Sequence, residues 1–357
     1  MSQRIHRRTF VRLAGLAGLG LVGACRASET PAASPASQQA PSSAAAATSE
    51  PRKLKMGFSG LFDITKLSYP VAMSRLKDQG VEIEPIFMDS AVVTFKSLIA
   101  GELDLAEGAV AAAIQANQAN QGTDDRLRVF AAMNPVTDYV IVTIPEITSL
   151  QGLIGRRFGV ARLGSISQFV PQVVLQRSGL DPSAVEWIAV GGTAARRAAM
   201  VSGAIVGGVM HIEEALAAQK DGYNIIFEAA TLMPEYIANG LVAKDRFIRD
   251  NPALIQQVTD AMIDAARWIM ENRDAAINVA LQQNGSAGDP ELMGKAYDTM
   301  ARIHGWGVNG GLTADNMTAT MQEELEMKTI EQPMPWEDWA TLDYVNHYLA
   351  EKGTYNK

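Results

Sequence analysis

Hydrophobic residues recur along the chain in two alternating patterns, one typical of strands and the other of helices. An apolar run over 54–59 is followed by a helix-like stretch over 66–77 and by strand-like alternation over 81–88. The same reasoning predicts helices over 92–99 and 109–119, with strands over 104–107 and 128–133. Strands that alternate with helices predict a mainly parallel sheet covered by helices.

A second set of alternating elements follows. Its strands are predicted over 157–161, 185–190, 206–210 and 223–228, and its helices over 167–177, 193–202 and 213–220. The chain is therefore predicted to form two α/β lobes in tandem. Two further strand-like segments, 138–143 and 240–243, stand where the chain would cross between the lobes, and two crossings predict a double hinge. The predicted lobes are 53–143 with 239–357, and 144–238.

The last third of the chain is predominantly helical in pattern. Asn251 before Pro252 is a typical helix N-cap with proline at the first helical position. Leu254, Val258 and Met262 then repeat at helical spacing, which predicts one apolar face. We expect these helices to pack onto the first lobe. The aromatic residues expected to close the fold are Trp336, Trp339, Tyr344 and Tyr348.

The N-terminal segment has the pattern of an export leader. Arg7 and Arg8 precede an apolar stretch over 13–23 that is too short to span a bilayer. The paired arginines favour the twin-arginine route, with general export as the alternative. Cys25, the only cysteine, follows small residues typical of lipoprotein cleavage, so 1–25 is predicted to be a leader with lipid attached to Cys25 on the outer face of the cell membrane. Cleavage elsewhere, leaving a free thiol, is the alternative.

Composition separates the leader from the folded body. Segment 26–52 is rich in Ala, Ser, Pro and Gln and has too few large apolar residues to offset the entropy of ordering, which predicts a flexible tether. The formal net charge is −8, and loss of the arginines of the leader makes the processed chain more negative. This charge disfavours nucleic acid as a partner and disfavours electrostatic docking on membranes.

Three stretches, in this order and spacing, resemble a known family. They are FKSLIAGELDLA (95–106), GLVAKDRFIRDNP (240–252) and WIMENRDAA (268–276). The chain from Leu54 to about Tyr348 resembles the periplasmic solute-binding proteins of the nitrate, sulfonate and thiamine-pyrimidine group of ABC importers. The resemblance implies a monomer with two α/β lobes joined by two crossing strands. It also implies a small-molecule ligand in the interlobe cleft, and permease and ATPase subunits as partners.

Open α/β sheets bind ligands beyond the carboxyl ends of their strands, so the loops there supply the candidate site. In the first lobe, Phe62 is a stacking candidate, with lobe packing as the alternative. Ser59 and Asp63 can bind the ligand or cap the next turn. Glu107 can contact the ligand or form a solvated strand end.

In the second lobe, Ser165 and Ser167 precede a helix, where they can bind an anionic or carbonyl group or simply cap the helix. Met210 and His211 end a strand, and a lone histidine there is either a ligand contact or structural. The segments that cross between the lobes add the candidates Asn134, Tyr139 and Tyr236.

The residue types in these loops favour a heterocyclic ligand. The loops contain no lysine, and Arg162 is their only arginine. Flat or polarizable surface is offered by Phe62, Tyr139, Phe169, Met210, Met233 and Tyr236. The hypothesis is a riboflavin or thiamine-pyrimidine precursor ligand, with an aliphatic sulfonate, taurine or nitrate as the alternative. A lipoprotein that presents its ligand to a receptor would use the same site.

An enzyme is the remaining class, because the resembling fold is shared with the suicide enzyme that builds the thiamine pyrimidine from its own histidine. That enzyme has clustered cysteines and an iron site. Here the body has no cysteine, and His211, His304 and His347 are far apart in sequence. Phosphate loops, zinc motifs and serine elbows are also absent from the sequence. We therefore predict a binding protein with no catalytic residues, no cofactor and no metal.

Overall fold

The structure is a computed structural model of the chain, and it describes residues 51–120, 126–283 and 288–356. The predicted leader, the predicted lipidation site Cys25 and the tether up to residue 50 lie outside the described residues. The described residues all belong to one compact unit.

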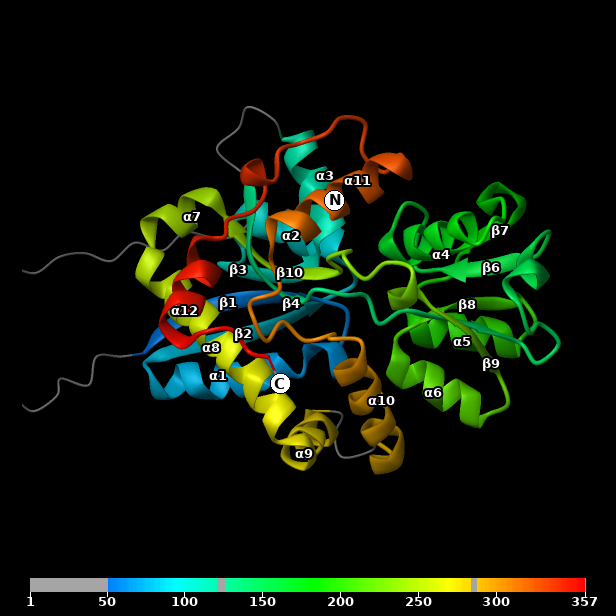
Figure 1. Cartoon of the computed structure of the whole chain (residues 1–357), viewed down its shortest axis with the longest axis horizontal. Helices are drawn as coiled ribbons and strands as arrows, with labels where there is room; N and C mark the ends of the chain where they lie inside the picture. Colours follow the sequence, from blue (N-terminus) through cyan, green and yellow to red (C-terminus); the bar gives the residue numbers. More distant parts are fainter. Residues whose placement is uncertain (1–50, 121–125, 284–287, 357) are drawn as a thin grey trace, which may run out of the picture. The chain divides into compact units, whose positions relative to one another are not determined.

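The first sheet has five strands in the order β2-β1-β3-β10-β4 (Figure 1). These strands are β1 (Arg52–Ser59), β2 (Val81–Met88), β3 (Leu105–Ala109), β4 (Leu127–Asn134) and β10 (Asn239–Lys244). Strand β1 runs parallel to β2 and β3, whereas β10 runs antiparallel between β3 and β4. The second crossing of the chain thus enters the middle of this sheet.

The second sheet also has five strands, in the order β7-β6-β8-β5-β9. They are β5 (Val140–Thr143), β6 (Arg157–Val160), β7 (Glu186–Ala189), β8 (Gly207–Met210) and β9 (Asn224–Glu228). Strand β6 is parallel to β7 and β8, and β5 is antiparallel to β8 and β9. The predicted fold class, two mainly parallel sheets flanked by helices and joined by two crossings, is confirmed. Because β5 pairs in the second sheet, the first crossing is the short segment 135–139, before the residue 143 at which the prediction ended the first lobe.

Helices flank both sheets (Figure 1). Those inserted between the strands are α1 (Ser68–Asp78), α2 (Ala91–Ala100), α3 (Val110–Ala119), α4 (Ile166–Arg177), α5 (Thr193–Val201) and α6 (Ile212–Lys220). Those after β10 are α7 (Asp245–Asp250), α8 (Pro252–Glu271), α9 (Arg273–Gln283), α10 (Pro290–Arg302), α11 (Ala314–Glu326) and α12 (Asp343–Lys352). Short 3-10 turns are η1 (Ile64–Lys66), η2 (Leu150–Leu153), η3 (Pro182–Ala184), η4 (Ala229–Thr231) and η5 (Trp336–Asp338). Within the described ranges, none of the helices has the length and hydrophobicity needed to cross a bilayer.

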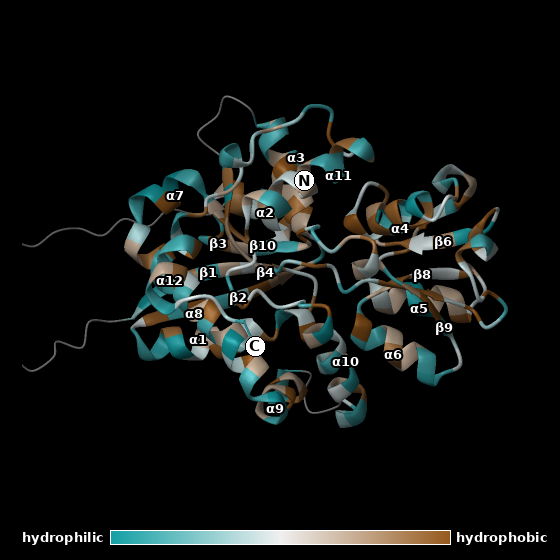
Figure 2. Cartoon of the chain, viewed as in Figure 1, coloured by the Kyte–Doolittle hydropathy of each residue, from teal (hydrophilic) through white to brown (hydrophobic). Residues whose placement is uncertain are grey.

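The two faces of the first sheet bury different sets of apolar residues. Met56 and Leu241 belong to the core cluster shared with α1 and α8, whereas Ala106 and Val242 belong to the cluster shared with α2 and α3. This alternation follows from the two-residue period of a strand. Figure 2 shows hydrophobic residues on the strands and a largely hydrophilic α7. The prediction that the last aromatic residues close the fold is supported by Trp339, which is fully buried.

Helix α8 begins at the predicted proline, but its capping differs from the prediction. Asn251 occupies the N-cap position without forming a side-chain cap hydrogen bond. Its Oδ1 instead accepts a hydrogen bond from Nη2 of Arg52 at 2.6 Å, and its Nδ2 donates to the carbonyl of Phe247 at 2.8 Å. The side chain therefore joins the start of β1 to the end of α7.

Candidate functional site

The loop after β1 brings an acidic and a basic side chain together in the interior. Asp63 precedes η1 and accepts hydrogen bonds from the Thr65 amide at 3.0 Å and from Nζ of Lys66 at 2.7 Å. Asp63 and Lys66 are 8% and 3% exposed. Burial acts to raise the pKa of Asp63, but the charges of Lys66 and His211 outweigh it and lower this pKa to about 2. Both side chains are therefore charged at neutral pH.

Glu107 lies in the middle of β3 and is fully buried. Its Oε2 accepts a hydrogen bond from the Ser59 amide at 3.2 Å. Burial, together with the charge of Asp63, raises the pKa of Glu107 to about 7, although Lys66 and His211 act in the opposite direction. The alternative predicted for Glu107 was a carboxylate exposed to solvent at the end of a strand. The burial of Glu107 is inconsistent with that alternative.

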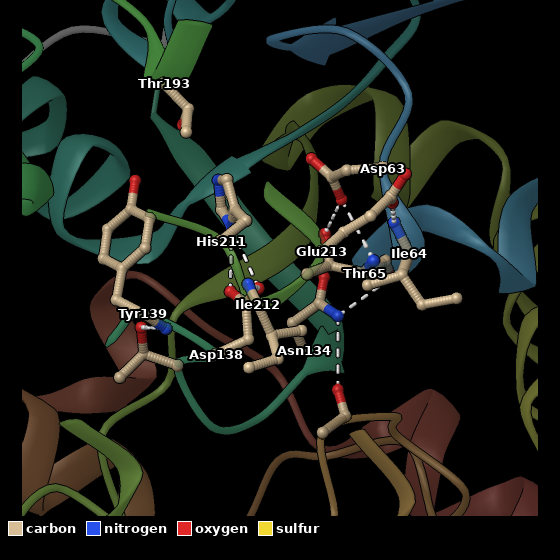
Figure 3. Close-up of polar contacts among 12 residues, drawn as sticks. Asp63, Ile64, Thr65, Asn134, Asp138, Tyr139, Thr193, His211, Ile212 and Glu213 are labelled. Carbon is tan, nitrogen blue, oxygen red and sulfur yellow. Dashed lines mark hydrogen bonds and ion pairs between the residues drawn. The ribbon is translucent and has the colours of Figure 1, made fainter. Parts of the chain in front are cut away.

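The first crossing and the end of β8 meet through His211. Its Nδ1 lies 2.8 Å and 3.0 Å from the two carboxylate oxygens of Asp138, and the Ile212 amide also donates to Asp138, at 3.1 Å (Figure 3). Burial acts to lower the pKa of His211, but the carboxylates of Asp138 and Asp63 outweigh it and raise this pKa well above its usual value. The imidazole ring contacts the Tyr139 ring in a tilted arrangement, with centroids 4.7 Å apart and an interplanar angle of 44°.

Two glutamates at the start of α6, Glu213 and Glu214, extend this group of buried ionisable side chains toward the first sheet. Oε2 of Glu213 accepts a hydrogen bond from the Ile64 amide at 3.2 Å, so a residue of the second sheet's helix touches η1 (Figure 3). Burial and the neighbouring Glu214 raise the pKa of Glu213 to about 7. Burial also raises the pKa of Glu214, and the charge of His211 opposes that rise.

Arg196 of α5 is a buried cation bound by its own lobe. Its guanidinium donates to the carbonyls of Val209 at 2.8 Å and Gly191 at 2.7 Å, and to Oγ1 of Thr193 at 2.9 Å. These bonds fix the loop between β7 and α5. We use the name polar layer for Asp63, Lys66, Glu107, Asp138, Arg196, His211, Glu213 and Glu214.

The structure places several other predicted site residues beside this layer. Phe62 and Tyr139 are partly buried, and Phe62 packs against the main core cluster. Ser59 contributes its amide to Glu107. Asn134 is 2% exposed and donates to the carbonyls of Thr65 at 2.9 Å and Gly305 at 3.2 Å.

The remaining predicted contacts are engaged elsewhere in the fold. Ser167 accepts from the Ala161 amide at 2.7 Å, and Ser165 donates to the Arg162 carbonyl at 2.7 Å, so both hydroxyls stabilise the loop before α4. Met210 is fully buried in the core. Tyr236 packs on Phe169, and its hydroxyl donates to Glu324 of α11 at 2.7 Å. Among the described residues, the hydrogen bonds of the Ser165, Ser167 and Tyr236 side chains go to groups outside the polar layer.

Sequence reasoning missed five members of the polar layer. The residues that were not among the predicted contacts are Lys66, Asp138, Arg196, Glu213 and Glu214. A partial signal existed for Lys66, which stands three residues after Asp63 at the spacing of a helical ion pair. No comparable signal marks Asp138, because its partner lies in a distant segment. Among the residues that the structure describes, no group of three or more His, Cys, Asp or Glu side chains is arranged to hold a metal ion.

A family model matches the sequence across residues 47–282, which include both crossings and the whole second sheet. The description of that family is NMT1-like. The chain belongs to the NMT1-like family. No curated protein matches this family member at the level of sequence.

Solved structures share the fold of this NMT1-like chain at low sequence identity. A protein of Bordetella bronchiseptica superposes with a TM-score of 0.70 and 20% identity, over 85% of this chain and 99% of its own. The alkanesulfonate-binding protein of Xanthomonas axonopodis pv. citri gives 0.67 and 16%, over 82% and 100%. The periplasmic nitrate-binding protein of Synechocystis gives 0.67 and 12%, over 85% and 89%. The fold is therefore that of the periplasmic binding proteins.

Proposed function

We propose that this chain is the solute-binding lipoprotein of an ABC-type importer and that it binds a small nitrogen heterocycle between its two sheets. Family membership and the fold support the transport role, since similar structures bind alkanesulfonate or nitrate. Two crossings between two sheets also suit closure around a ligand by hinge bending. In this proposal the lipid on Cys25 holds the protein at the outer face of the membrane, where it acts as a monomer and delivers the ligand to a permease and its ATPase.

The charge balance of the polar layer carries the proposal for the ligand. The layer contains more carboxyl groups than cations, and each cation already has partners. Lys66 is paired with Asp63, His211 with Asp138, and Arg196 with backbone carbonyls. A nitrate or sulfonate would need several donors without competing carboxylates. The layer therefore disfavours the small anions that the similar proteins bind.

The aromatic side chains beside the layer favour a flat ligand. Tyr139 lies against His211 with the two rings tilted at 44°, and Phe62 is partly buried at the loop after β1. Aromatic rings stack on heterocycles with offset geometry and gain energy beyond simple burial. Riboflavin and thiamine-pyrimidine precursors are the vitamin-class ligands that we propose to test first.

We propose binding rather than catalysis. The chain's only cysteine is Cys25, so the polar layer offers no thiol nucleophile. A sensor that presents the ligand to a receptor would use the same layer, and only the partner would differ. Ligand uptake by cells that carry or lack this protein separates the two roles.

A thermal-shift screen of the purified protein tests the ligand class. The panel is riboflavin, an aminopyrimidine alcohol, thiamine, taurine, an alkanesulfonate and nitrate. A ligand that binds only the folded state raises the melting temperature by mass action. We expect the heterocycles to raise it and the anions not to. A response to taurine or nitrate alone would contradict the heterocycle, and no response at all would contradict solute binding by this layer.

A further inference from the structure

Glu107 is a charged residue in an apolar face of the first sheet. In register it lies beside Phe58 of β1 and Leu241 of β10, so these three side chains share one face. Phe58 in turn meets Tyr69 edge to face with centroids 5.1 Å apart. A glutamate at such a position costs folding stability unless its carboxyl group is fully bonded.

The carboxyl group of Glu107 is only half bonded. Oε2 accepts from the Ser59 amide, whereas Oε1 is buried and has no hydrogen-bond partner among the described residues. The hydroxyl of Tyr69 and Oδ1 of Asn134 are likewise buried without partners in the described part of the chain. Oγ of Ser68 and Oε2 of Glu214 are also buried without partners among the described residues. Buried polar atoms in proteins are almost always bonded, so this group of atoms requires an explanation.

The groups that face Glu107 do not supply the missing contact. Lys66 of η1 forms its ion pair with Asp63 at 2.7 Å, and His211 at the end of β8 forms its own with Asp138 at 2.8 Å. The charges of Lys66, Asp63 and His211 nevertheless shift the pKa of Glu107, and the charge of Glu107 raises the pKa of Tyr69. Glu107 therefore lies within the polar layer and makes no ion pair with any residue between 51 and 356 that the structure describes.

We infer that Oε1 of Glu107 accepts a hydrogen bond from a basic nitrogen of the ligand, and that the ligand is an amine, amidine or aminopyrimidine bound as a cation. This inference rests on the proposed function. A cation there would bond the unpartnered oxygen and balance the excess of carboxylates. A neighbouring positive charge stabilises the carboxylate, so the proton that Glu107 partly holds near pH 7 would leave it. With an amine or amidine, which is already a cation in solution, that proton goes to the buffer. With an aminopyrimidine that is neutral in solution, it goes to the ring nitrogen, with no net release.

Calorimetry of the purified protein tests the inference. The probes are an aminopyrimidine alcohol, thiamine, benzamidine, riboflavin, taurine and nitrate, each titrated at pH 7 in phosphate and in Tris. We expect benzamidine, which is a cation before it binds, to bind with proton release, seen as a binding enthalpy that differs between the two buffers, and the aminopyrimidine alcohol to bind with little or no net release. Glu107→Gln should weaken that binding by about ten- to one-hundred-fold, the range for a hydrogen bond to a charged group, and should reduce the proton release.

Glu323→Gln is the matched control. Glu323 of α11 is also a buried glutamate with an unpartnered oxygen in the described structure, but it lies outside the polar layer and pairs with Arg177. Its substitution should leave the affinity unchanged. Proton release by the wild-type protein is measured without any variant, so it tests the inference even if Glu107→Gln folds poorly.

The outcomes separate this inference from the proposed function. Equal binding of a basic probe by wild type and Glu107→Gln would overturn the inference and leave the transport role intact. Binding of riboflavin alone, or of taurine or nitrate alone, would also overturn it while retaining a solute-binding protein. No binding of any probe would overturn both.

Discussion

Nδ1 of His211 lies 2.8 Å from Oδ1 of Asp138, although 73 residues separate them in the chain. Asp138 belongs to the first crossing, and His211 ends the strand that pairs with β5. Their side chains are 5% and 21% exposed. The contact therefore fixes the end of the second sheet to the first crossing.

Replacing Asp138 by Asn should lower the free energy of unfolding by about 2–3 kcal/mol at pH 6, because it removes a hydrogen bond to a charged group. The pKa of His211 is raised by its partner, so the stability from this pair is fully present below the pKa of an unfolded histidine, about 6.5. It declines as the pH rises through the higher folded pKa. Chemical unfolding of both proteins between pH 5 and 9 measures this, and the difference between them should shrink with rising pH.

His347→Gln is the control for that series. His347 is exposed on α12, where it pairs with Glu351 at 3.3 Å. Exposed ion pairs contribute roughly 0–1 kcal/mol. If the loss of unfolding free energy depended on pH equally in His347→Gln and in Asp138→Asn, the pH dependence could not be assigned to the pair of His211 and Asp138.

Asp63→Asn should lower the free energy of unfolding by about 3 kcal/mol at pH 7, because it leaves the buried ammonium of Lys66 without its partner. The pKa of Asp63 is lowered to about 2, so its stabilising contribution is present above the unfolded value near 4 and is lost as the pH falls toward 2. Urea unfolding at pH 7 and pH 3 checks both statements. Lys53→Ala, which breaks the exposed 3.9 Å pair with Glu82, should change stability by less than about 0.5 kcal/mol.

Glu107→Gln should become relatively more stable than the wild type as the pH rises. The pKa of Glu107 is raised from 4.5 to about 7, so the folded protein keeps a proton that the unfolded chain releases. The wild type therefore loses stability between pH 4.5 and 7, by up to about 3 kcal/mol for a shift of this size. Melting temperatures of the two ligand-free proteins from pH 4 to 8 test this. A constant difference would show that Glu107 titrates normally.

Tyr236→Phe should lower the free energy of unfolding by about 1–3 kcal/mol without changing ligand affinity. The lost hydroxyl leaves a buried oxygen of Glu324 unbonded, which explains the cost. Because this hydroxyl already donates its hydrogen bond to Glu324 of α11, it is not available to a ligand. Urea unfolding and calorimetry measure the two quantities. Tyr223→Phe is the control, since the Tyr223 hydroxyl makes no hydrogen bond with the described residues. If Tyr236→Phe lowered the ligand affinity, Tyr236 would have to be counted among the residues that bind the ligand.

Several elements could be predicted from local pattern alone. The strand over 54–59 and the helix over 193–202 follow from side-chain periodicity, and both appear within one or two residues of the predicted bounds. The cap of α8 could not be predicted in full, since the partner of Asn251 is Arg52, at the other end of the first sheet. Local sequence places the helix start, and a distant residue decides how it is bonded.

The site was predicted in part for the same reason. Asp63, Glu107 and His211 were predicted as contacts because they follow or end strands at the carboxyl edges of the two predicted sheets, and the structure places all three in the polar layer; that they bind a ligand stays a prediction. Ser165 was predicted from the loop after a strand and Tyr236 from the second crossing segment, but neighbouring groups of the fold bind their hydroxyls. Position at a strand end thus selects candidates, and it does not show which of them are already bonded.

Periodicity and motif order are local properties, so the two α/β units, their two crossings and the resemblance to importer-associated binding proteins could be predicted from the sequence. The electrostatic character between the sheets could be seen only in the folded chain. In the folded chain, Lys66 is buried beside Asp63 and His211 is paired with Asp138. One oxygen of Glu107 has no hydrogen-bond partner among the described residues. Charge–charge energies depend on distance and burial, which sequence separation does not specify. That is why the chain's fold follows from its pattern while the chemistry proposed for its ligand follows from a single buried carboxyl group.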